Sequence, residues 1–214
     1  AEELLREARI GRLRQWVELA DQKLAGSSKR MIMNAGNDDP FYIDDVLHSG
    51  EYLECPEARV IELGDLSMVS VGYANMTPWI CPRDIPEEEL ARKIDAAVDQ
   101  VTDLERCIFN LHAPPYGTQL DLAVGLDAEL RPSMSFGADE THVGSRAVRA
   151  AIEKYQPLLA LHGHIHEQHA FIRIGRTICV NPGSEYHLGQ LRGFYVEFDG
   201  RGVRRFGLTR EEIV

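Results

Sequence analysis

The sequence predicts one α/β domain built on a parallel sheet, and three observations support this prediction. Three segments with helical hydrophobic spacing each precede a short apolar segment, an order that is typical of a parallel sheet covered on both faces. Polar residues follow each apolar segment, at the strand ends where ligands of such sheets bind. The chain of 214 residues is 44% hydrophobic and 27% charged, as in ordinary globular proteins. We therefore expect a single domain over residues 1–214.

The spacing of apolar residues defines three helices. The first presents one stripe, made of Leu13, Trp16, Val17, Ala20 and Leu24, which must cover a core. The second begins near Pro86, a residue favoured in the first helical turn, and the third begins near residues 144–145. Ala1 lies inside the first helix without a preceding cap or an initiating Met, so we expect coding sequence upstream of it. A processed or cloned start is the alternative.

The strands are predicted from apolar runs and turn residues. We expect parallel strands at residues 31–33, 107–109 and 157–161, and a hairpin of residues 59–63 and 66–73. The tail predicts consecutive antiparallel strands at residues 170–174, 177–180, 194–198 and 203–208. Residues 113 to about 142 are rich in Gly, Pro and Ser and are expected to form a long irregular loop, which in compact domains is usually functional or disordered.

Candidate metal ligands follow the three parallel strands. Asn37 and Asp38 follow the first, His112 the second, and His164 and His166 the third. Imidazole nitrogen, amide oxygen and carboxylate together suit Mn, Fe, Zn, Co or Ni better than Ca or Mg. The sequence therefore predicts a metal site at this edge of the sheet.

Four motifs stand out in the chain: Gly36-Asn37-Asp38-Asp39, His112 with its Ala-Pro-Pro, Gly163-His164-Ile165-His166 and Asn181-Pro182-Gly183-Ser184. They resemble motifs of the calcineurin-like metallophosphoesterases, in particular of their bacterial and archaeal phosphodiesterase branch. The resemblance covers residues 30 to about 200. It implies a β-sandwich flanked by helices, a four-layer αββα arrangement, with two divalent metal ions at the strand ends. It also implies that Asn37, His112 and His164 bind one ion and that His166 binds the other.

The first two motifs of that family, Asp-x-His and Gly-Asp, are not found before residue 36. Gly64-Asp65 matches the second motif in letters only, because it comes after the asparagine motif and fits a hairpin turn. Either an upstream segment supplies the two missing motifs, or the chain is a degenerate relative that binds at most one metal ion. The start of the sequence, without a helix cap or Met, favours the upstream segment. In the first case we expect an open or apolar sheet edge beside the strand that ends at Ala35.

Two further residues are candidates with open roles. Asp38 stands where the family commonly has a histidine that orients or protonates the leaving group. An ordinary carboxylic acid is ionised at pH 7 and donates protons poorly, which argues against a simple acid role for Asp38. Two roles are therefore left open: Asp38 is catalytic, or it caps a helix that begins near Phe41. His142 is expected at a helix N-terminus, where free amides favour a phosphate; it either binds substrate or caps the helix.

The expected activity is hydrolysis of phosphate esters, with small phosphodiesters as the favoured substrates and two Mn ions as the favoured cofactors. A non-catalytic binding or scaffold protein of the same fold is the alternative. The net charge of −11 argues against stable nucleic-acid binding. No apolar run reaches the length of a membrane span, and four scattered cysteines indicate a reducing compartment, so a cytoplasmic protein is expected.

Overall fold

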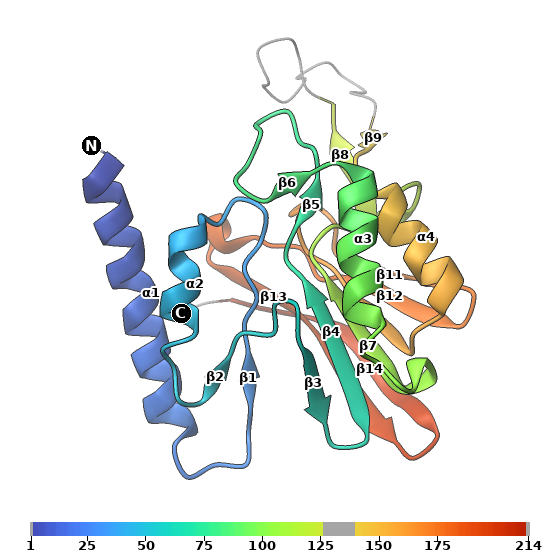
Figure 1. Cartoon of the computed structure of the whole chain (residues 1–214), viewed down its shortest axis with the longest axis horizontal. Coiled ribbons are helices and arrows are strands. Elements are labelled where there is room, and N and C mark those ends of the chain that lie inside the picture. The colour runs from blue at the N-terminus through green and yellow to red at the C-terminus, as the bar shows by residue number, and fades with distance from the viewer. Residues whose placement is uncertain (1, 126–139, 213–214) are drawn as a thin grey trace.

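The centre of the structure, a computed structural model that describes residues 2–125 and 140–212, is a six-stranded mixed sheet. Its strand order is β11-β12-β10-β7-β4-β3 (Figure 1). The four inner strands run parallel, and each edge strand runs antiparallel to its neighbour. The strands are β3 (Val60–Leu63), β4 (Leu66–Val71), β7 (Cys107–Leu111), β10 (Leu159–Leu161), β11 (Ala170–Ile174) and β12 (Thr177–Asn181). An α/β fold is therefore confirmed.

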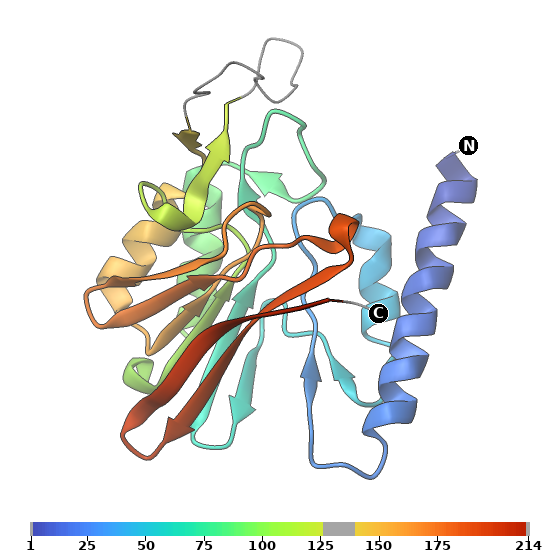
Figure 2. The same ribbon diagram turned by 180° about the vertical axis from the view of Figure 1, so that it is seen from behind.

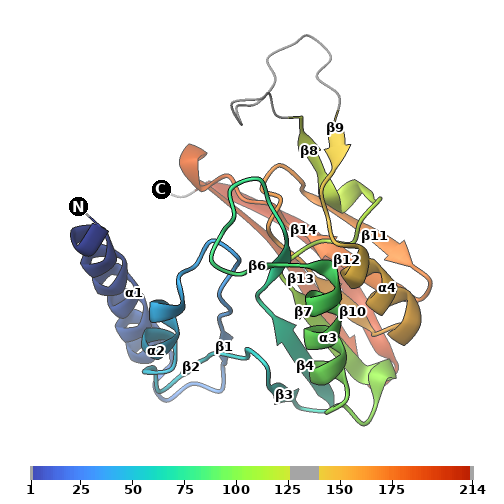
Figure 3. The ribbon, with the colours of Figure 1, turned by 45° about the horizontal axis from the view of Figure 1, so that its top comes forward.

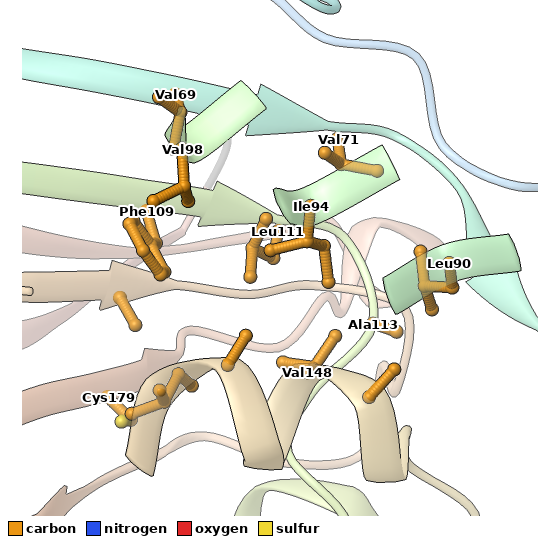
Figure 4. Close-up of a cluster of buried hydrophobic side chains, with 14 of the residues drawn as sticks. Val69, Val71, Leu90, Ile94, Val98, Phe109, Leu111, Ala113, Val148 and Cys179 are labelled. Carbon is orange, nitrogen blue, oxygen red and sulfur yellow. The ribbon is translucent and has the colours of Figure 1, made fainter. Parts of the chain in front are cut away.

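Two helices cover one face of this sheet. They are α3 (Glu87–Val98) and α4 (Arg146–Tyr155), and both were predicted near these bounds. Side chains alternate between the faces of a strand, so Val69 and Phe109 point into the core under the helices, where both are fully buried. Figure 4 shows them packed with Ile94 of α3 and Val148 of α4.

A long hairpin covers the opposite face. It consists of β13 (Gln190–Asp199) and β14 (Gly202–Glu212), which pair antiparallel and lie across the sheet in Figure 2. Met68 and Ile108, one position along from the residues that face the helices, pack there against Phe194 and Phe206. Burial on both faces explains why these strands are almost entirely apolar.

The first helix packs apart from the central sheet. α1 (Glu2–Leu24) and α2 (Asp44–Leu47) share a hydrophobic cluster with Leu53 of β2 (Leu53–Glu54). Figure 3 shows this group to one side of the sheet. The predicted stripe of α1 is correct except for Trp16, which is 53% exposed, because the buried residues Leu13, Val17 and Ala20 form a narrower stripe beside it.

The predicted parallel strand at residues 31–33 is placed wrongly. β1 (Met31–Ile32) pairs in parallel with β2 in a separate two-stranded sheet and does not join the six-stranded one. Met31 is exposed and Ile32 only half-buried, so the apolar run does not mark a strand buried on both faces. The remaining edge of β1 has no strand partner within residues 2–125 and 140–212.

The predicted tail also differs from the structure. β11 and β12 form the expected antiparallel pair, but β12 pairs on its other side in parallel with β10, so these strands belong to the central sheet. Short elements complete the fold: η1 (Phe41–Ile43), β5 (Ala74–Asn75), β6 (Asp84–Ile85), η2 (Leu104–Arg106), η3 (Gln119–Asp121), β8 (Leu122–Val124), β9 (Glu140–His142) and η4 (Tyr186–Leu188). Part of the expected loop thus forms the β8–β9 pair, and residues 126–139 lie outside the described residues.

Of the helices in the described parts of the chain, none has the length and apolar character that a membrane span requires.

Candidate metal centre

Three of the predicted ligands meet at the carboxyl ends of the strands. His112 directly follows β7 and His164 follows β10, and these two strands are neighbours in the sheet. Asn37 reaches the same place from β1 because Gly36 passes against the ring of His112. A Cβ atom on Gly36 would lie only 2.7 Å from His112 Cε1. The absence of a side chain at Gly36 therefore lets the asparagine segment reach the histidines.

The amide oxygen of Asn37 is the point on which both rings converge. His112 Nε2 and His164 Nδ1 each lie 3.0 Å from Asn37 Oδ1. The ring centroids are 5.2 Å apart, with the planes inclined at 71°. The 3.0 Å between each ring nitrogen and the amide oxygen is also the distance between neighbouring ligand atoms around one metal ion, since two bonds of about 2.1 Å at a right angle place their ligand atoms about 3 Å apart. Two imidazole nitrogens and one amide oxygen thus fit a divalent ion.

Burial keeps these imidazoles neutral. Burial, followed by the charges of His164, His166 and His162, lowers the pKa of His112 to about 3. Burial also lowers the pKa of His164, against the opposing charge of Asp84. Both rings are therefore neutral at pH 7, the charge state from which an imidazole binds a metal ion.

His166 lies beside this trio. Its side chain is exposed, and its ring stacks edge-on against Tyr186 with the centroids 6.4 Å apart. Its charge lowers the pKa of both His112 and His164, so it is within electrostatic reach of them. Within the described residues no three His, Cys, Asp or Glu side chains are arranged to hold a metal ion. The candidate ligand set consequently depends on the amide of Asn37.

The structure corrects one of the two roles expected for Asp38. Asp38 is exposed, and the turn is closed by Asp39, whose Oδ2 accepts a hydrogen bond of 2.8 Å from the Gly36 N–H. The short helix η1 has Pro40 at its N-cap and no side-chain cap. The alternative that Asp38 caps this helix is therefore wrong, and a catalytic role for it stays a prediction.

The reason given for a substrate role of His142 is also wrong. His142 lies at the end of β9, and its Nδ1 is 2.9 Å from Oδ1 of Asp121. The amides at the start of α4 are not free: Glu87 accepts hydrogen bonds from Arg146 N and Ala147 N, each of 2.9 Å. The helix is capped by Ser145. Contact of His142 with substrate remains a prediction, but free amides at the start of a helix no longer support it.

Two residues next to the candidate ligands are Asp84, which the sequence did not indicate, and His162, whose role the sequence left open. The Nδ2 of Asn37 donates to Asp84, 47 positions away, at 2.8 Å; Asp84 stands in no motif and gave no signal. His162 is buried, and its Nδ1 donates to the carbonyls of Leu111 and Ala113. It therefore supports the segment that carries His112.

Replacement of Gly36 with alanine is expected to weaken Mn²⁺ binding about tenfold, because the new methyl group must displace a ligand ring. Gly163→Ala is the matched control, since a Cβ there would lie 3.7 Å from His112 Nδ1, an ordinary contact. Isothermal titration calorimetry of both variants measures the difference. Equal affinities for the two variants would show that the ring of His112 does not bind the ion.

Comparison with known proteins supports the fold. No protein-family model matches the chain. The uncharacterized protein MJ1162 of Methanocaldococcus jannaschii is 33% identical over 128 residues, which are 59% of this chain and 52% of that protein. The chain thus spans about half the length of this curated relative.

Two solved structures have a related fold. One crystal structure matches with a TM-score of 0.58 and 17% identity, over 100% of this chain and 81% of its own. The crystal structure of TT1561 of Thermus thermophilus matches with a TM-score of 0.52 and 17% identity, over 86% of this chain and 72% of its own. At these identities the likeness concerns the fold alone.

Proposed function

We propose that the protein is a metal-dependent phosphoesterase of the calcineurin-like type. The observation that carries the proposal is the convergence of His112 Nε2 and His164 Nδ1 on Asn37 Oδ1 at the strand ends. These residues belong to the motifs that resemble the family. In this proposal Asn37, His112 and His164 hold one ion, and His166 contributes to a second.

The same proposal extends to the layers of the fold. Ile32 of β1 packs in the same hydrophobic cluster as Phe194 and Val196 of β13. We propose that β1–β2 and β13–β14 correspond to the second sheet of an αββα sandwich. The helices α1 and α2 would then belong to its outer layer.

Divalent ions at such a site neutralise the phosphoryl oxygens and activate water for attack on phosphorus. The chain's part is to hold neutral imidazoles and an amide oxygen in place before the substrate arrives. During hydrolysis the water oxygen bonds to phosphorus and the ester P–O bond breaks, and the leaving oxygen departs as an anion or, when it is a poor leaving group, takes up a proton. The mixed nitrogen and oxygen ligands suit Mn, Fe, Zn, Co or Ni, and of these ions we propose Mn²⁺.

The proposed substrate is a small phosphodiester, handled by a cytoplasmic protein. The net charge of −11 opposes stable binding of nucleic acid, whereas bound cations reverse the field locally and attract a small anion. An exposed Asp38 in place of histidine favours an ester whose leaving group needs no protonation. Nitrophenyl esters have such leaving groups, and simple alkyl esters do not.

Rates with a nitrophenyl and an alkyl phosphodiester, with and without chelator, test the proposed function. We expect hydrolysis to stop after dialysis against chelator and to return with Mn²⁺. Hydrolysis that is indifferent to chelator would contradict the metal mechanism. A protein that binds Mn²⁺ at this site without hydrolysing either ester would instead be the non-catalytic binding module.

Asp38→Asn separates the possible roles of that carboxylate. If Asp38 does not transfer a proton, both substrates keep nearly unchanged rates in the variant. If Asp38 is the general acid, the alkyl ester loses about a hundredfold in rate while the nitrophenyl ester keeps its rate. The ratio of the two rates in the variant, set against the unmodified protein, is the measurement.

A further inference from the structure

The carboxylate of Asp84 is shared between a candidate ligand and a nearby turn. Its Oδ1 accepts from Asn37 Nδ2 at 2.8 Å. Its Oδ2 accepts from Thr77 N at 3.1 Å, from Thr77 Oγ1 at 2.5 Å and from Cys81 N at 2.8 Å. Burial raises the pKa of Asp84, but the hydrogen bonds from Thr77, Asn37 and Cys81 outweigh it and lower the pKa overall. The side chain is therefore an acceptor with both oxygens in use.

This arrangement fixes which way the amide of Asn37 faces. An aspartate carboxylate at pH 7 accepts hydrogen bonds and donates none, so only the NH₂ group of Asn37 can face Asp84. The amide oxygen is then left to face His112 and His164, as found. The reverse orientation would direct NH₂ protons at the ion, and an amide in that orientation cannot ligate a cation.

We propose that Asp84 is a positioning residue of the metal centre, holding Asn37 with its oxygen toward the ion. The inference rests on the proposed function and extends it to a residue that does not touch the ion. Groups that orient a metal ligand typically change metal affinity about 10–100-fold when they are removed. The hydrogen bonds from Thr77 and Cys81 hold Asp84 itself in the turn between β5 and β6.

Asp84→Asn gives a sharp test because the two oxygens of Asp84 have different partners. The three donors from Thr77 and Cys81 hold the oxygen of the new amide, so its NH₂ group faces Asn37. Asn37 must then turn its own oxygen toward position 84 and its NH₂ toward the histidines. We expect Mn²⁺ affinity to fall about 10–100-fold, although the substituted side chain has nearly the same shape.

A readout without metal follows from the same reversal. In the metal-free Asp84→Asn variant, nuclear Overhauser effects should appear between the carboxamide protons of Asn37 and the ring protons of His112 or His164. In the unmodified protein these protons should instead be protected from exchange by Asp84. Unchanged amide contacts in the variant would overturn the inference, whether or not the unmodified protein binds Mn²⁺. Failure of the unmodified protein to bind Mn²⁺, with the reversal observed, would contradict the proposed function and leave only the effect of Asp84 on the orientation of Asn37.

Two further variants distinguish orientation from a general role in the turn. Thr77→Val removes one donor to Oδ2 and leaves the bond between Asp84 and Asn37, so Mn²⁺ affinity should change less than about twofold, well below the effect of losing an orienting group. The double variant Asn37→Asp with Asp84→Asn exchanges the two side chains. It restores an oxygen that faces the ion, the hydrogen bond between positions 37 and 84, and the net charge. It should therefore recover most of the Mn²⁺ affinity. A loss in Thr77→Val as large as in Asp84→Asn would show that Asp84 acts only by ordering the turn.

Discussion

Replacing His112 with alanine is expected to lower the rate of phosphodiester hydrolysis about a hundredfold or more. The substitution removes one of three ligand atoms and leaves Asn37 Oδ1 with one ring, that of His164, 3.0 Å away. Charge that develops on the phosphoryl oxygens then loses its nearby cation, and a hundredfold corresponds to about 2.7 kcal/mol of transition-state stabilisation. Rates at saturating Mn²⁺ and the Mn²⁺ dissociation constant should be measured on the same preparation.

His48→Ala serves as the matched control for this substitution. His48 is exposed, and its Nδ1 lies 2.7 Å from Asp44 O, one turn back in its own helix. Its loss should leave both the rate and the Mn²⁺ affinity unchanged. Full activity of His112→Ala with unaltered metal affinity would refute the assignment of His112 as a ligand and with it the proposed mechanism.

The parts of the fold that the sequence predicts are those in which local pattern and burial agree. In β7, Ile108 and Phe109 are buried on opposite faces of the sheet, so its strand character is visible in the sequence. The run Met31-Ile32-Met33 has the same appearance, but it is exposed to half-buried and pairs with β2. An apolar run does not reveal its partner, because pairing depends on residues distant in sequence.

The same distinction applies to the site. His112 and His164 could be brought together from the sequence because each ends a strand and parallel strands end at one edge. Asp84 could not, because its contact with Asn37 spans 47 positions and depends on the turn at Thr77. Residues that hold a ligand in place need no fixed spacing from it. Their detection required the folded geometry.

Replacing Asp121 with alanine is expected to cost about 3 kcal/mol of the free energy of unfolding, a large loss for one polar side chain. Asp121 is fully buried. Its Oδ1 accepts from Thr118 N at 2.8 Å and lies 2.9 Å from His142 Nδ1, and its Oδ2 accepts from Gly117 N and Gly144 N at 3.0 Å each. Removal of the carboxylate leaves these donors without their acceptor, and each unsatisfied buried group costs about 1–3 kcal/mol.

Urea unfolding of Asp121→Ala, Asp121→Asn and Asp103→Ala measures this effect. Asp103 is the N-cap of the short 3₁₀ helix η2 and accepts from Glu105 N at 3.0 Å. It is exposed, so its loss should cost only about 1 kcal/mol. Asp121→Asn should approach the alanine variant, because both carboxylate oxygens face donors and an NH₂ group can replace neither. A value for Asp121→Ala no larger than for Asp103→Ala would mean that water satisfies the loop donors. Residues 113–125 and 140–145 would then be held by β8–β9 pairing rather than by this buried side chain.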